Sequence, residues 1–352
     1  MTHPALPNVI LGNGNRRFSG VTSTLLQVLP HQIGQTHVVI LGAAHMPADA
    51  QTVSFFGALK LLRQAAAVSH PVVFHARRNI EMVQALLLKT LGAKTLRVLF
   101  TSTAQRRHSR FTRWLMAQMH CVISTCTAAA SYLNVPPHQL IPHGVDTERF
   151  VPRNPSLPPK RHVFPATHQI CILGRVRHQK GVDILIEAAI PLLKIQPEWG
   201  ILVVGEIKKE DLSFVQRLKD ELDREGLLDR VKFTGLQPFG TLPAYFRHAD
   251  IVTALSRNEG FGLTVLEAMG SGTAVLASMA GAWPDIVQHE QNGLLVPIDD
   301  VEATRTALSA LMSDPELRAR LAKAARADVM ARFDVRHEAQ TLCALYERMS
   351  AL

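Results

Sequence analysis

The second half of the chain alternates short apolar runs with longer amphipathic segments, and this alternation restricts the possible folds more than any other feature. The segments between the runs, such as Val182–Ile195 and Leu212–Glu225, carry apolar residues at helical spacing. Strands that alternate with helices form a parallel sheet covered by helices on both faces. We therefore predict an α/β domain whose strands are Ile170–Leu173, Ile201–Val204, Val231–Phe233, Ile251–Leu255, Ala274–Ala277 and Leu294–Val296.

The first half shows the same alternation less regularly. Its helical stretches include Glu81–Leu91 and Arg110–Met119, and it predicts a second Rossmann-like domain. Two such domains that face one another form a cleft, which is a preferred place for a small-molecule site. The predicted strands are Val9–Leu11, Val38–Leu41, Val72–Phe74, Arg97–Phe100 and Val122–Ser124.

The length of 352 residues favours two domains. The proline-rich segment 152–165 lacks hydrophobic periodicity and is typical of a linker. We expect a first domain over 1–165, a second over 166–330, and a C-terminal helix over 331–352 that crosses back to the first domain.

Charge is divided unevenly between the halves. Residues 1–165 contain 17 basic and four acidic residues, a net charge of +13, whereas the remainder has a net charge of −4. This asymmetry predicts an anionic partner for the first half: nucleic acid, an anionic membrane surface or a phosphorylated substrate. Aromatic residues make up only 6% of the chain, which disfavours a stacking platform for single-stranded nucleic acid.

The four cysteines form no disulfide framework or zinc-type spacing, as expected of reduced thiols in a cytosolic protein. The first eight residues lack the basic and apolar regions of a signal peptide. The stretches 18–48 and 114–145 have no Lys, Arg, Asp or Glu, but polar residues interrupt both, so neither predicts a membrane span. We expect a protein that is soluble or bound peripherally to a membrane.

The loop after the first predicted strand is rich in glycine. Gly12 and Gly14 match the start of a dinucleotide fingerprint, but Arg17 stands where its third glycine would be. No acid follows the strand Val38–Leu41, so the pattern argues against NAD. The glycines still permit close approach of a ligand to the backbone.

The loop after Leu173 carries Arg175 and Lys180 and opens a helix. Two cations beside a helix N-terminus form a suitable site for a phosphate or diphosphate. Further along, Glu259 and two glycines lead into a helix that carries Glu267. Eight helical steps would separate these carboxylates by roughly 12 Å. That spacing suits the sugar and ribose hydroxyls of a nucleotide sugar, with amides near Phe261–Leu263 meeting the diphosphate.

These motifs resemble the GT-B glycosyltransferases of family 4, which retain anomeric configuration. The matching residues are Arg175, Lys180, and Glu259 with seven residues before Glu267. Pro142–Asp146, followed by Arg149 and Phe150, is similar to the segment that enters the family's interdomain linker, and Gly293–Pro297 is similar to its last core strand. The resemblance covers essentially the whole second domain and implies the GT-B fold, in which two Rossmann-like domains face a central cleft.

The first domain is similar to a narrower group, the lipopolysaccharide-core mannosyltransferases. The matching segments are Arg16–Thr24, His75–Asn79, Phe100–His108 and Thr112–Leu115. This group implies GDP-mannose as donor, a Kdo residue of the inner core on lipid A as acceptor, and a cytoplasmic enzyme held peripherally at the inner membrane by electrostatic attraction. The sequence carries no DxD-like signature, so we expect no required metal or other cofactor.

The resemblance implies three sets of site residues. The catalytic set is Glu259, Arg175, Lys180 and His75. The donor-binding set is Gly14, Gly20, Arg175, Lys180, Gly205, Glu259, Gly260, Phe261, Gly262, Leu263 and Glu267. The acceptor-binding set is Arg16, Arg17, Arg77, Arg78, Arg106 and Arg107. The chain departs from the family at Phe100, where many members place a histidine at a strand end; His75 and His108 are the candidates to replace it.

Three other interpretations fit part of the pattern. The same fold could use a UDP- or ADP-sugar to build another surface glycan. A basic nucleic-acid-binding protein would explain the charge of the first half but leaves Glu259 and Glu267 unexplained, so we expect no nucleic-acid partner. A two-domain solute-binding protein is disfavoured by the absence of a signal peptide.

Overall fold

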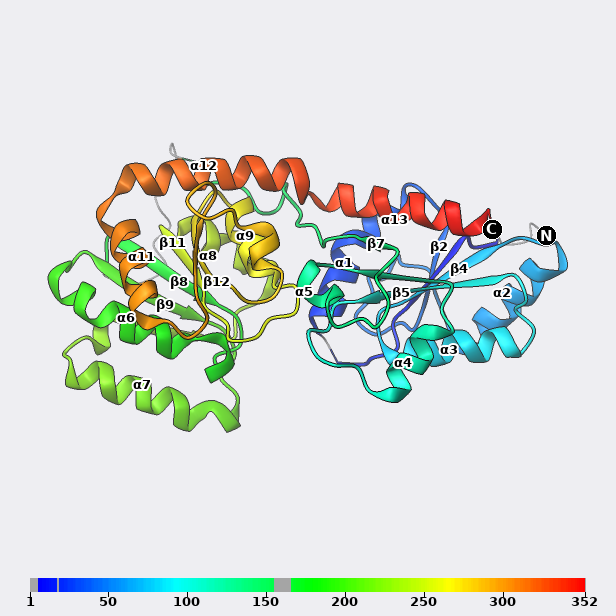
Figure 1. The fold of residues 1–352 in the computed structure, drawn as a ribbon, viewed down its shortest axis with the longest axis horizontal. Coiled ribbons are helices and arrows are strands. Elements are labelled where there is room, and N and C mark those ends of the chain that lie inside the picture. Colours follow the sequence, from blue (N-terminus) through cyan, green and yellow to red (C-terminus); the bar gives the residue numbers. More distant parts are fainter. Residues whose placement is uncertain (1–5, 18, 155–165, 352) are drawn as a thin grey trace. The chain divides into compact units, whose positions relative to one another are not determined.

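The computed structural model describes residues 6–17, 19–154 and 166–351 (Figure 1). The chain divides into two compact units, the first made of residues up to 144 together with 335–352 and the second of residues 145–334. The expected domain boundary at residue 165 and most of the expected linker lie outside the described residues.

The first unit contains a seven-stranded sheet in the order β3-β2-β1-β4-β5-β6-β7, and all of its paired strands are parallel. The five predicted strands are confirmed, and two strands of two residues each extend the sheet at its edges. The strands are β1 (Val9–Gly12), β2 (Val38–Leu41), β3 (Thr52–Val53), β4 (Val72–Ala76), β5 (Leu96–Ser102), β6 (Cys121–Ser124) and β7 (Gln139–Leu140).

Helices cover both faces of this sheet (Figure 1). One face packs against the amphipathic helices α1 and α13, and the other packs against α2, α3 and α4. Side chains of Ser54 and Ser109 cap α2 and α4 by accepting hydrogen bonds from backbone amides of the first turn. The helices are α1 (Gly20–Ile33), α2 (Phe55–Ala67), α3 (Asn79–Thr90), α4 (Arg110–Ala117), α5 (Thr127–Ala130) and α13 (Val335–Ser350).

The second unit contains a six-stranded parallel sheet in the order β10-β9-β8-β11-β12-β13. All six predicted strands are confirmed. The strand order reverses between β8 and β11, which creates a topological switch point where loops from the two directions meet. The strands are β8 (His168–Leu173), β9 (Trp199–Val204), β10 (Val231–Gly235), β11 (Ile251–Ala254), β12 (Ala274–Ser278) and β13 (Leu294–Val296).

The helices of the second unit lie on both faces of its sheet (Figure 1). The large core between α6, α7, α11 and the sheet is built from Ile, Leu and Val, with Trp199 completely enclosed. The helices are α6 (Val182–Ile195), α7 (Leu212–Arg224), α8 (Leu242–His248), α9 (Leu263–Gly270), α10 (Trp283–Ile286), α11 (Val301–Ser313) and α12 (Pro315–Arg332). The short 3-10 turns are η1 (His178–Lys180), η2 (Lys209–Asp211), η3 (Leu228–Arg230) and η4 (Phe239–Thr241).

The segment expected to be one helix over 331–352 is divided. Helix α12 ends at Arg332, and α13 begins at Val335. Between them, the amide of Val145 donates to the carbonyl of Phe333, and Val145 and Asp334 form an isolated β-bridge. The chain passes from one unit to the other at these two points. The apolar side of α13 packs on α1 in the first unit.

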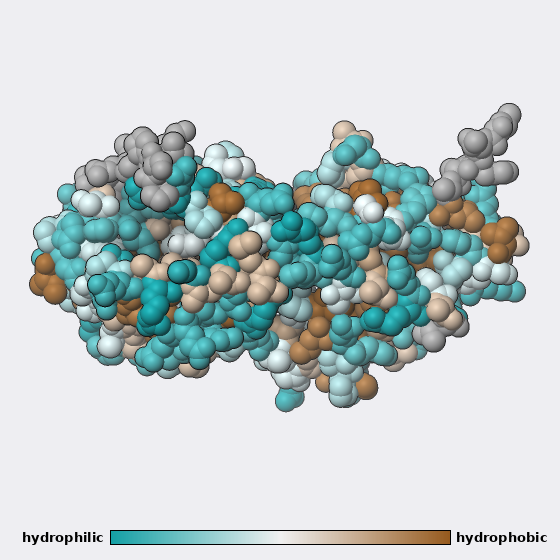
Figure 2. All heavy atoms as spheres, turned by 90° about the horizontal axis from the view of Figure 1, so that it is seen from above, coloured by the Kyte–Doolittle hydropathy of each residue, from teal (hydrophilic) through white to brown (hydrophobic). Residues whose placement is uncertain are grey.

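On the face that Figure 2 shows, apolar residues are scattered among hydrophilic ones. Within the described ranges, we find no helix with the length and hydropathy that a membrane span needs.

Candidate active site

The loops after β8 and β11 lie at the switch point of the second sheet. Gly174 follows β8 with φ of +132°, and Gly205 follows the neighbouring strand β9 with φ of +157°. A Cβ atom on Gly205 would lie 1.8 Å from the carbonyl oxygen of Gly174, so only glycine fits there. This tight backbone contact holds the start of the Arg175–Lys180 loop against the sheet edge.

Lys180 and Glu259, from the two different loops, form an ion pair. The Glu259 carboxylate also lies 3.3 Å from the Ser256 hydroxyl and 3.2 Å from the Gly260 amide, both of which donate to it. Both charged side chains are only partly exposed, at 20% for Lys180 and 16% for Glu259. The structure therefore brings together a cation and a carboxylate that sequence spacing alone leaves 79 residues apart.

Arg257, which the sequence pattern did not single out, joins the two loops. Its guanidinium donates to both carboxylate oxygens of Asp183, at 2.9 and 3.0 Å, and to the carbonyl of His178 in the turn before Lys180. It also forms an ion pair of 2.5 Å with Asp299. Arg257 is thus a positioning residue that holds the Lys180 turn beside the Glu259 loop.

Arg175 has different partners from Lys180. Its guanidinium donates to Glu210 at 2.6 Å and to Asp211 at 3.0 Å. Hydrogen bonds from Arg175 to Asp211 and Glu210 raise the pKa of this guanidinium, which stays charged. A diphosphate bound here would have to share Arg175 with these carboxylates or take it from them.

The turn that leads into α9 depends on Gly262. This residue has φ of +76°, and a Cβ atom on it would lie 2.6 Å from the indole nitrogen of Trp283. The same indole donates to the Gly262 carbonyl at 3.0 Å. The ring of Phe261 is buried in the protein, so this residue offers a ligand its backbone rather than its side chain. Leu263 is the first residue of α9.

Glu267 lies on α9 and is 8% exposed. Burial raises the pKa of its carboxyl to about 7, and the nearby positive charge of Arg149 opposes that rise only in part. Because α9 begins at Leu263, only four helical steps, about 6 Å, lead to Glu267. The expected separation of roughly 12 Å assumed eight helical steps and does not apply, because Glu259 lies in the preceding loop.

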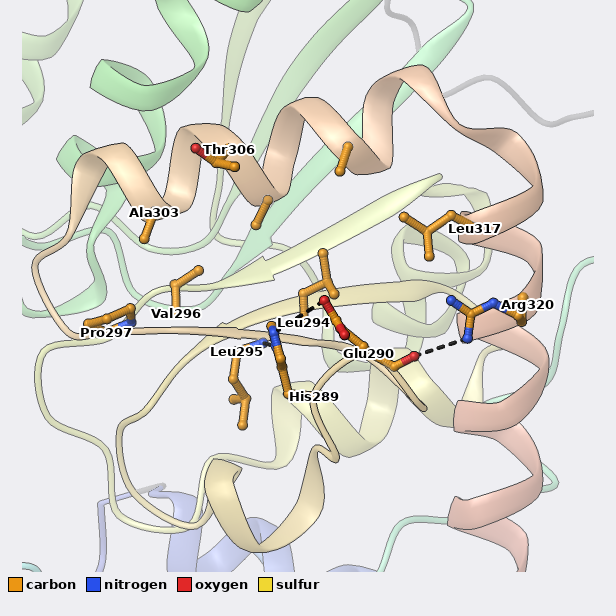
Figure 3. Close-up of a pocket in the computed structure, with 12 residues that line it drawn as sticks. His289, Glu290, Leu294, Leu295, Val296, Pro297, Ala303, Thr306, Leu317 and Arg320 are labelled. Atoms are coloured by element: carbon orange, nitrogen blue, oxygen red, sulfur yellow. Dashed lines mark hydrogen bonds and ion pairs between the residues drawn. The ribbon is translucent and has the colours of Figure 1, made fainter.

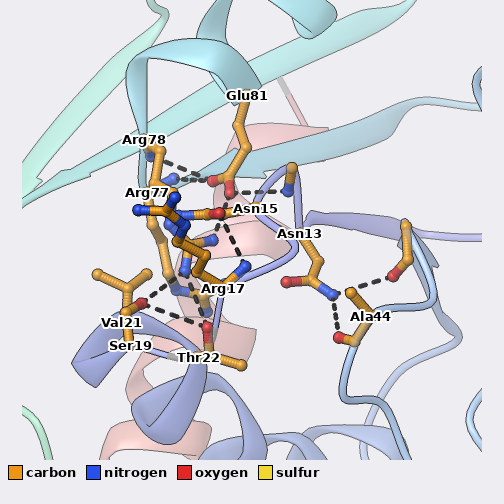
Figure 4. Close-up of polar contacts among 12 residues, drawn as sticks. Asn13, Asn15, Arg17, Ser19, Val21, Thr22, Ala44, Arg77, Arg78 and Glu81 are labelled. Carbon is orange, nitrogen blue, oxygen red and sulfur yellow. Dashed lines mark hydrogen bonds and ion pairs between the residues drawn. The ribbon is translucent and has the colours of Figure 1, made fainter.

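The glycine loop of the first unit is organised around a buried acid, Glu81, that the sequence analysis did not assign (Figure 4). Its carboxylate accepts hydrogen bonds from the backbone amides of Gly14, Arg77 and Arg78, at 3.1, 2.7 and 3.1 Å. The Arg78 guanidinium donates to it at 2.8 Å. A Cβ atom on Gly12 would lie 2.9 Å from Glu81 Cγ, so the glycines of this loop make room for the acid.

The basic residues expected to bind the acceptor are not equivalent. Arg78 also donates to Ser19 and Thr22 at 3.0 Å each, so both terminal nitrogens of its guanidinium have partners within the protein. Arg16, Arg17, Arg106 and Arg107 are exposed, and Gly20 begins α1 with open space around its Cα. One terminal nitrogen of Arg77, Nη1, is buried and has no hydrogen-bond partner among the described residues. Arg77 thus keeps one terminal nitrogen without a partner in the described part of the chain, whereas both terminal nitrogens of Arg78 are paired.

His75 is placed inside the first unit. Its Nδ1 lies 2.7 Å from the Tyr346 hydroxyl and its Nε2 lies 2.6 Å from the Thr101 hydroxyl. Burial holds the pKa of the imidazole well below its ordinary value, so the ring is neutral. The residue is 1% exposed, and its contacts join β4, β5 and α13. The geometry gives no support to the expected catalytic role and assigns His75 to the interior hydrogen bonding of this unit.

Phe100 does not stand at the end of its strand, because β5 continues to Ser102. Its ring packs into the core beneath α2, α3 and α4. The strand end is instead beside His108, whose Nε2 lies 3.4 Å from the Ser102 hydroxyl. Burial and the charge of Arg106 lower the pKa of His108. Of the two candidate histidines, His108 is the one with partial exposure at the carboxyl edge of the sheet.

A separate cavity of about 680 Å³ lies between the edge strand β13 and helices α11 and α12 (Figure 3). Its walls are mainly aliphatic, and Arg320 donates to the Glu290 carbonyl at 3.0 Å at one end. None of the residues expected in the active site lines it. In the described part of the chain, no cluster of three or more His, Cys, Asp or Glu side chains could hold a metal ion.

Comparison with known proteins identifies the family. A model of the family "Glycosyl transferases group 1" matches residues 158–328. The lipopolysaccharide core biosynthesis mannosyltransferase LpsB of Rhizobium meliloti is 39% identical, over 97% of this chain and 97% of that protein. This chain belongs to the group 1 glycosyltransferases. The lipopolysaccharide core biosynthesis mannosyltransferase LpcC of Rhizobium leguminosarum is 38% identical to this glycosyltransferase, over 97% of this chain and 96% of the relative.

Solved structures agree with this assignment. The C-terminal domain of a group 1 family protein, LpcC, from Francisella tularensis is 37% identical to the glycosyltransferase, with a TM-score of 0.52 over 54% of this chain and 99% of that one. Anabaena Alr3699/HepE, solved with UDP and glucose, has a TM-score of 0.78 at 22% identity over 98% of this chain and all of its own. The similarity to Alr3699/HepE concerns the fold alone. The predicted GT-B class is confirmed.

Proposed function

We propose that this glycosyltransferase moves mannose from GDP-mannose onto the Kdo residue of the lipopolysaccharide inner core, with retention of anomeric configuration. The observation that carries the proposal is the Lys180–Glu259 pair at the switch point, followed by the buried Glu267 on α9. The names of the two full-length relatives support mannose as the sugar and the lipopolysaccharide core as the product.

In this proposal the donor is bound by the second unit. Glu259 accepts hydrogen bonds from sugar hydroxyls, and Glu267 accepts them from the ribose. Lys180, Arg175 and the free amides at the start of α9 face the diphosphate. As the sugar–phosphate bond breaks, negative charge grows on the leaving diphosphate, and these groups stabilise it. The acceptor hydroxyl attacks the reacting sugar carbon from the same face as the one from which the leaving group departs. No enzyme nucleophile takes part. A proton NMR spectrum of the first product formed tests retention, because an inverted anomer would contradict it.

Nucleotide binding tests the donor. We expect GDP to protect the protein against thermal unfolding more than UDP or ADP at equal concentration, because only GDP resembles the proposed donor. At 100 times its dissociation constant, a ligand stabilises the native state by about 2.7 kcal/mol. Stronger protection by UDP or ADP would contradict the GDP-mannose assignment and favour the alternative in which the same fold builds another glycan.

The two glutamates are expected to have separable roles. Glu259→Gln should reduce turnover and sugar discrimination while leaving GDP affinity nearly unchanged, because a free nucleotide does not reach the sugar subsite. Glu267→Gln should lower the affinity for GDP itself. Calorimetric titration with GDP and GDP-mannose measures both, and loss of GDP binding in Glu259→Gln alone would reverse the assignment.

The raised pKa of Glu267 predicts how GDP affinity depends on pH. A ribose hydroxyl donates to the charged carboxylate, so binding at low pH must first remove the proton from Glu267. With a pKa of about 7 in the free protein, affinity at pH 6 should be about tenfold lower than at pH 8. Calorimetry across this range should show a steeper slope in the wild-type protein than in Glu267→Gln. The same slope in both proteins would exclude Glu267 as its source.

Acceptor recognition is proposed to involve the basic surface near α4, where the enzyme meets the anionic lipid at the cytoplasmic face of the inner membrane. Phe111 and Trp114 are each 56% exposed and stack with ring centroids 6.1 Å apart, and each directly follows an arginine in the sequence, Arg110 and Arg113. Exposed aromatic rings flanked by arginines suit the headgroup level of a membrane.

Charge reversal at Arg106, Arg107 and Arg110 should raise the KM for the acceptor about tenfold and leave that for the donor nearly unchanged. Each basic residue near an anionic surface contributes about 1 kcal/mol, and salt screens this attraction within about 8 Å. Binding to anionic liposomes should also fall steeply as salt rises. Reversal of Lys208, Arg217 and Lys323, which are exposed in the second unit, is the matched control. An equal effect of both triple variants would leave the α4 surface without its proposed role.

A further inference from the structure

A cavity of about 630 Å³ lies in the first unit, at the edge of the sheet opposite to the glycine loop that surrounds Glu81. Its floor is formed by the amino ends of β5, β6 and β7, and its wall by the last turn of α13. Its volume is within the range that accommodates small ligands. The lining residues are Arg97, His120, Cys121, His138, Gln139, Leu345, Arg348 and Met349.

Positive charge dominates the polar part of this cavity. Among the described residues, Arg97 has no ion-pair partner, and the one acceptor found for Arg348 is the neutral amide of Gln139, at 3.2 Å. No Asp or Glu is found among the described lining residues, and the neighbouring acid on α13, Glu347, is exposed. Two unneutralised guanidinium groups beside one cavity favour an anion that offers several oxygen acceptors.

His120 lines the same cavity. The amide of Val98 donates to its Nδ1 at 2.9 Å, so the neutral ring carries its proton on Nε2. Burial, with the charges of Lys89 and Arg97, lowers the pKa of His120 and keeps the ring neutral. The ammonium of Lys89 lies 3.2 Å from Nε2. Two donors thus face each other, and no described residue supplies the acceptor that both require.

The remaining wall is apolar. Leu345 and Met349 belong to the core beneath α13. Burial raises the pKa of Cys121 to about 11, so its thiol is neutral. The cavity therefore combines a cationic end with an apolar wall. This combination suits an amphiphile rather than a bare ion.

We propose that this cavity binds an amphiphilic phosphate, with its phosphate oxygens between Arg97, His120 and Arg348 and its hydrocarbon part against Leu345 and Met349. The seven residues of β5 place it roughly 20 Å from the carboxyl edge of the sheet. It is therefore a second site, distinct from the one that presents the acceptor hydroxyl. A bound amphiphile would fix the end of α13 to the sheet and add a point of attachment to an anionic membrane.

The test uses dihexanoyl phosphatidic acid, a water-soluble probe, titrated into the full chain by calorimetry. Dihexanoyl phosphatidylcholine has the same tails without net charge, and inorganic phosphate has the charge without tails. We expect the phosphatidic acid to bind at least tenfold more tightly than either. The double variant Arg97→Gln/Arg348→Gln should bind it at least tenfold more weakly than the wild-type protein.

The matched control removes two exposed charges elsewhere, Lys60→Gln/Lys323→Gln, and should bind as the wild-type protein does. Circular dichroism and GDP protection establish that each variant is folded. Equal weakening in both double variants would reduce the effect to overall charge and overturn the proposal. So would the absence of binding, or affinity for phosphate or phosphatidylcholine equal to that for phosphatidic acid.

Discussion

Replacing Lys180 by alanine is expected to lower kcat by about 10²-fold or more, because in the proposed mechanism its ammonium stabilises charge that grows on the diphosphate in the transition state. In the free protein Lys180 is held by Glu259, and Arg257 fixes the turn that carries it. The same loss is expected for Arg175→Ala. Single-turnover kinetics with GDP-mannose measure it, since they separate chemistry from product release.

The control for this experiment is Lys194→Ala. Lys194 also forms an ion pair with a glutamate, Glu225, but on the exposed surface of the same unit. Loss of such a pair costs at most about 1 kcal/mol of stability and should leave kcat unchanged. Near-normal turnover in both Lys180→Ala and Arg175→Ala would refute the diphosphate assignment.

Replacing Glu81 by alanine is expected to destabilise the first unit by about 3–5 kcal/mol, the usual cost of removing one partner of a buried ion pair. The carboxylate is fully buried, and its loss would leave the charge of Arg78 and three backbone amides without an acceptor. The midpoint of thermal unfolding should fall by roughly 10 °C. Differential scanning calorimetry measures this, and the GDP binding proposed for the second unit, if it equals that of the wild-type protein, reports that the rest of the protein is intact.

Asp49→Ala removes an exposed acid from the same unit and should change the midpoint little. If Glu81→Ala melted like Asp49→Ala, the four hydrogen bonds to Glu81 would not organise the glycine loop. Glu81→Gln keeps the size of the side chain, but its neutral amide cannot accept all four hydrogen bonds. We expect the unfolding midpoint of Glu81→Gln to lie between those of Glu81→Ala and Asp49→Ala.

Much of the fold could be predicted from local sequence pattern. Buried parallel strands require continuous apolar runs, and every such run identified in the second half is a strand. The glycines at 174, 205 and 262 mark loops because their positive φ angles exclude other residues. Boundaries were less accurate: β5 is longer than its apolar run, since Thr101 and Ser102 also extend the strand.

The motif residues were found by type and spacing, but their partners were not. Lys180 meets Glu259, Arg257 reaches Asp183 and Asp299, and Glu81 accepts from the loop that follows β1. Each contact joins residues far apart in the chain, and nothing in their local sequence specifies the pairing. The contact of His75 was hidden from the sequence for the same reason, because Tyr346, its partner, lies 271 residues away.

The sequence alone therefore determined the class of fold, the approximate positions of the longer strands and the identity of the charged loops. Those properties follow from the period of apolar residues and from the steric freedom of glycine, which act over a few residues. Only the tertiary structure decided which charges are neutralised within the protein, as at Arg78, and which lack an ion-pair partner in the described part of the chain, as at Arg97. The physical reason is that hydrogen bonds and ion pairs depend on distances of about 3 Å between atoms that only the folded chain brings together.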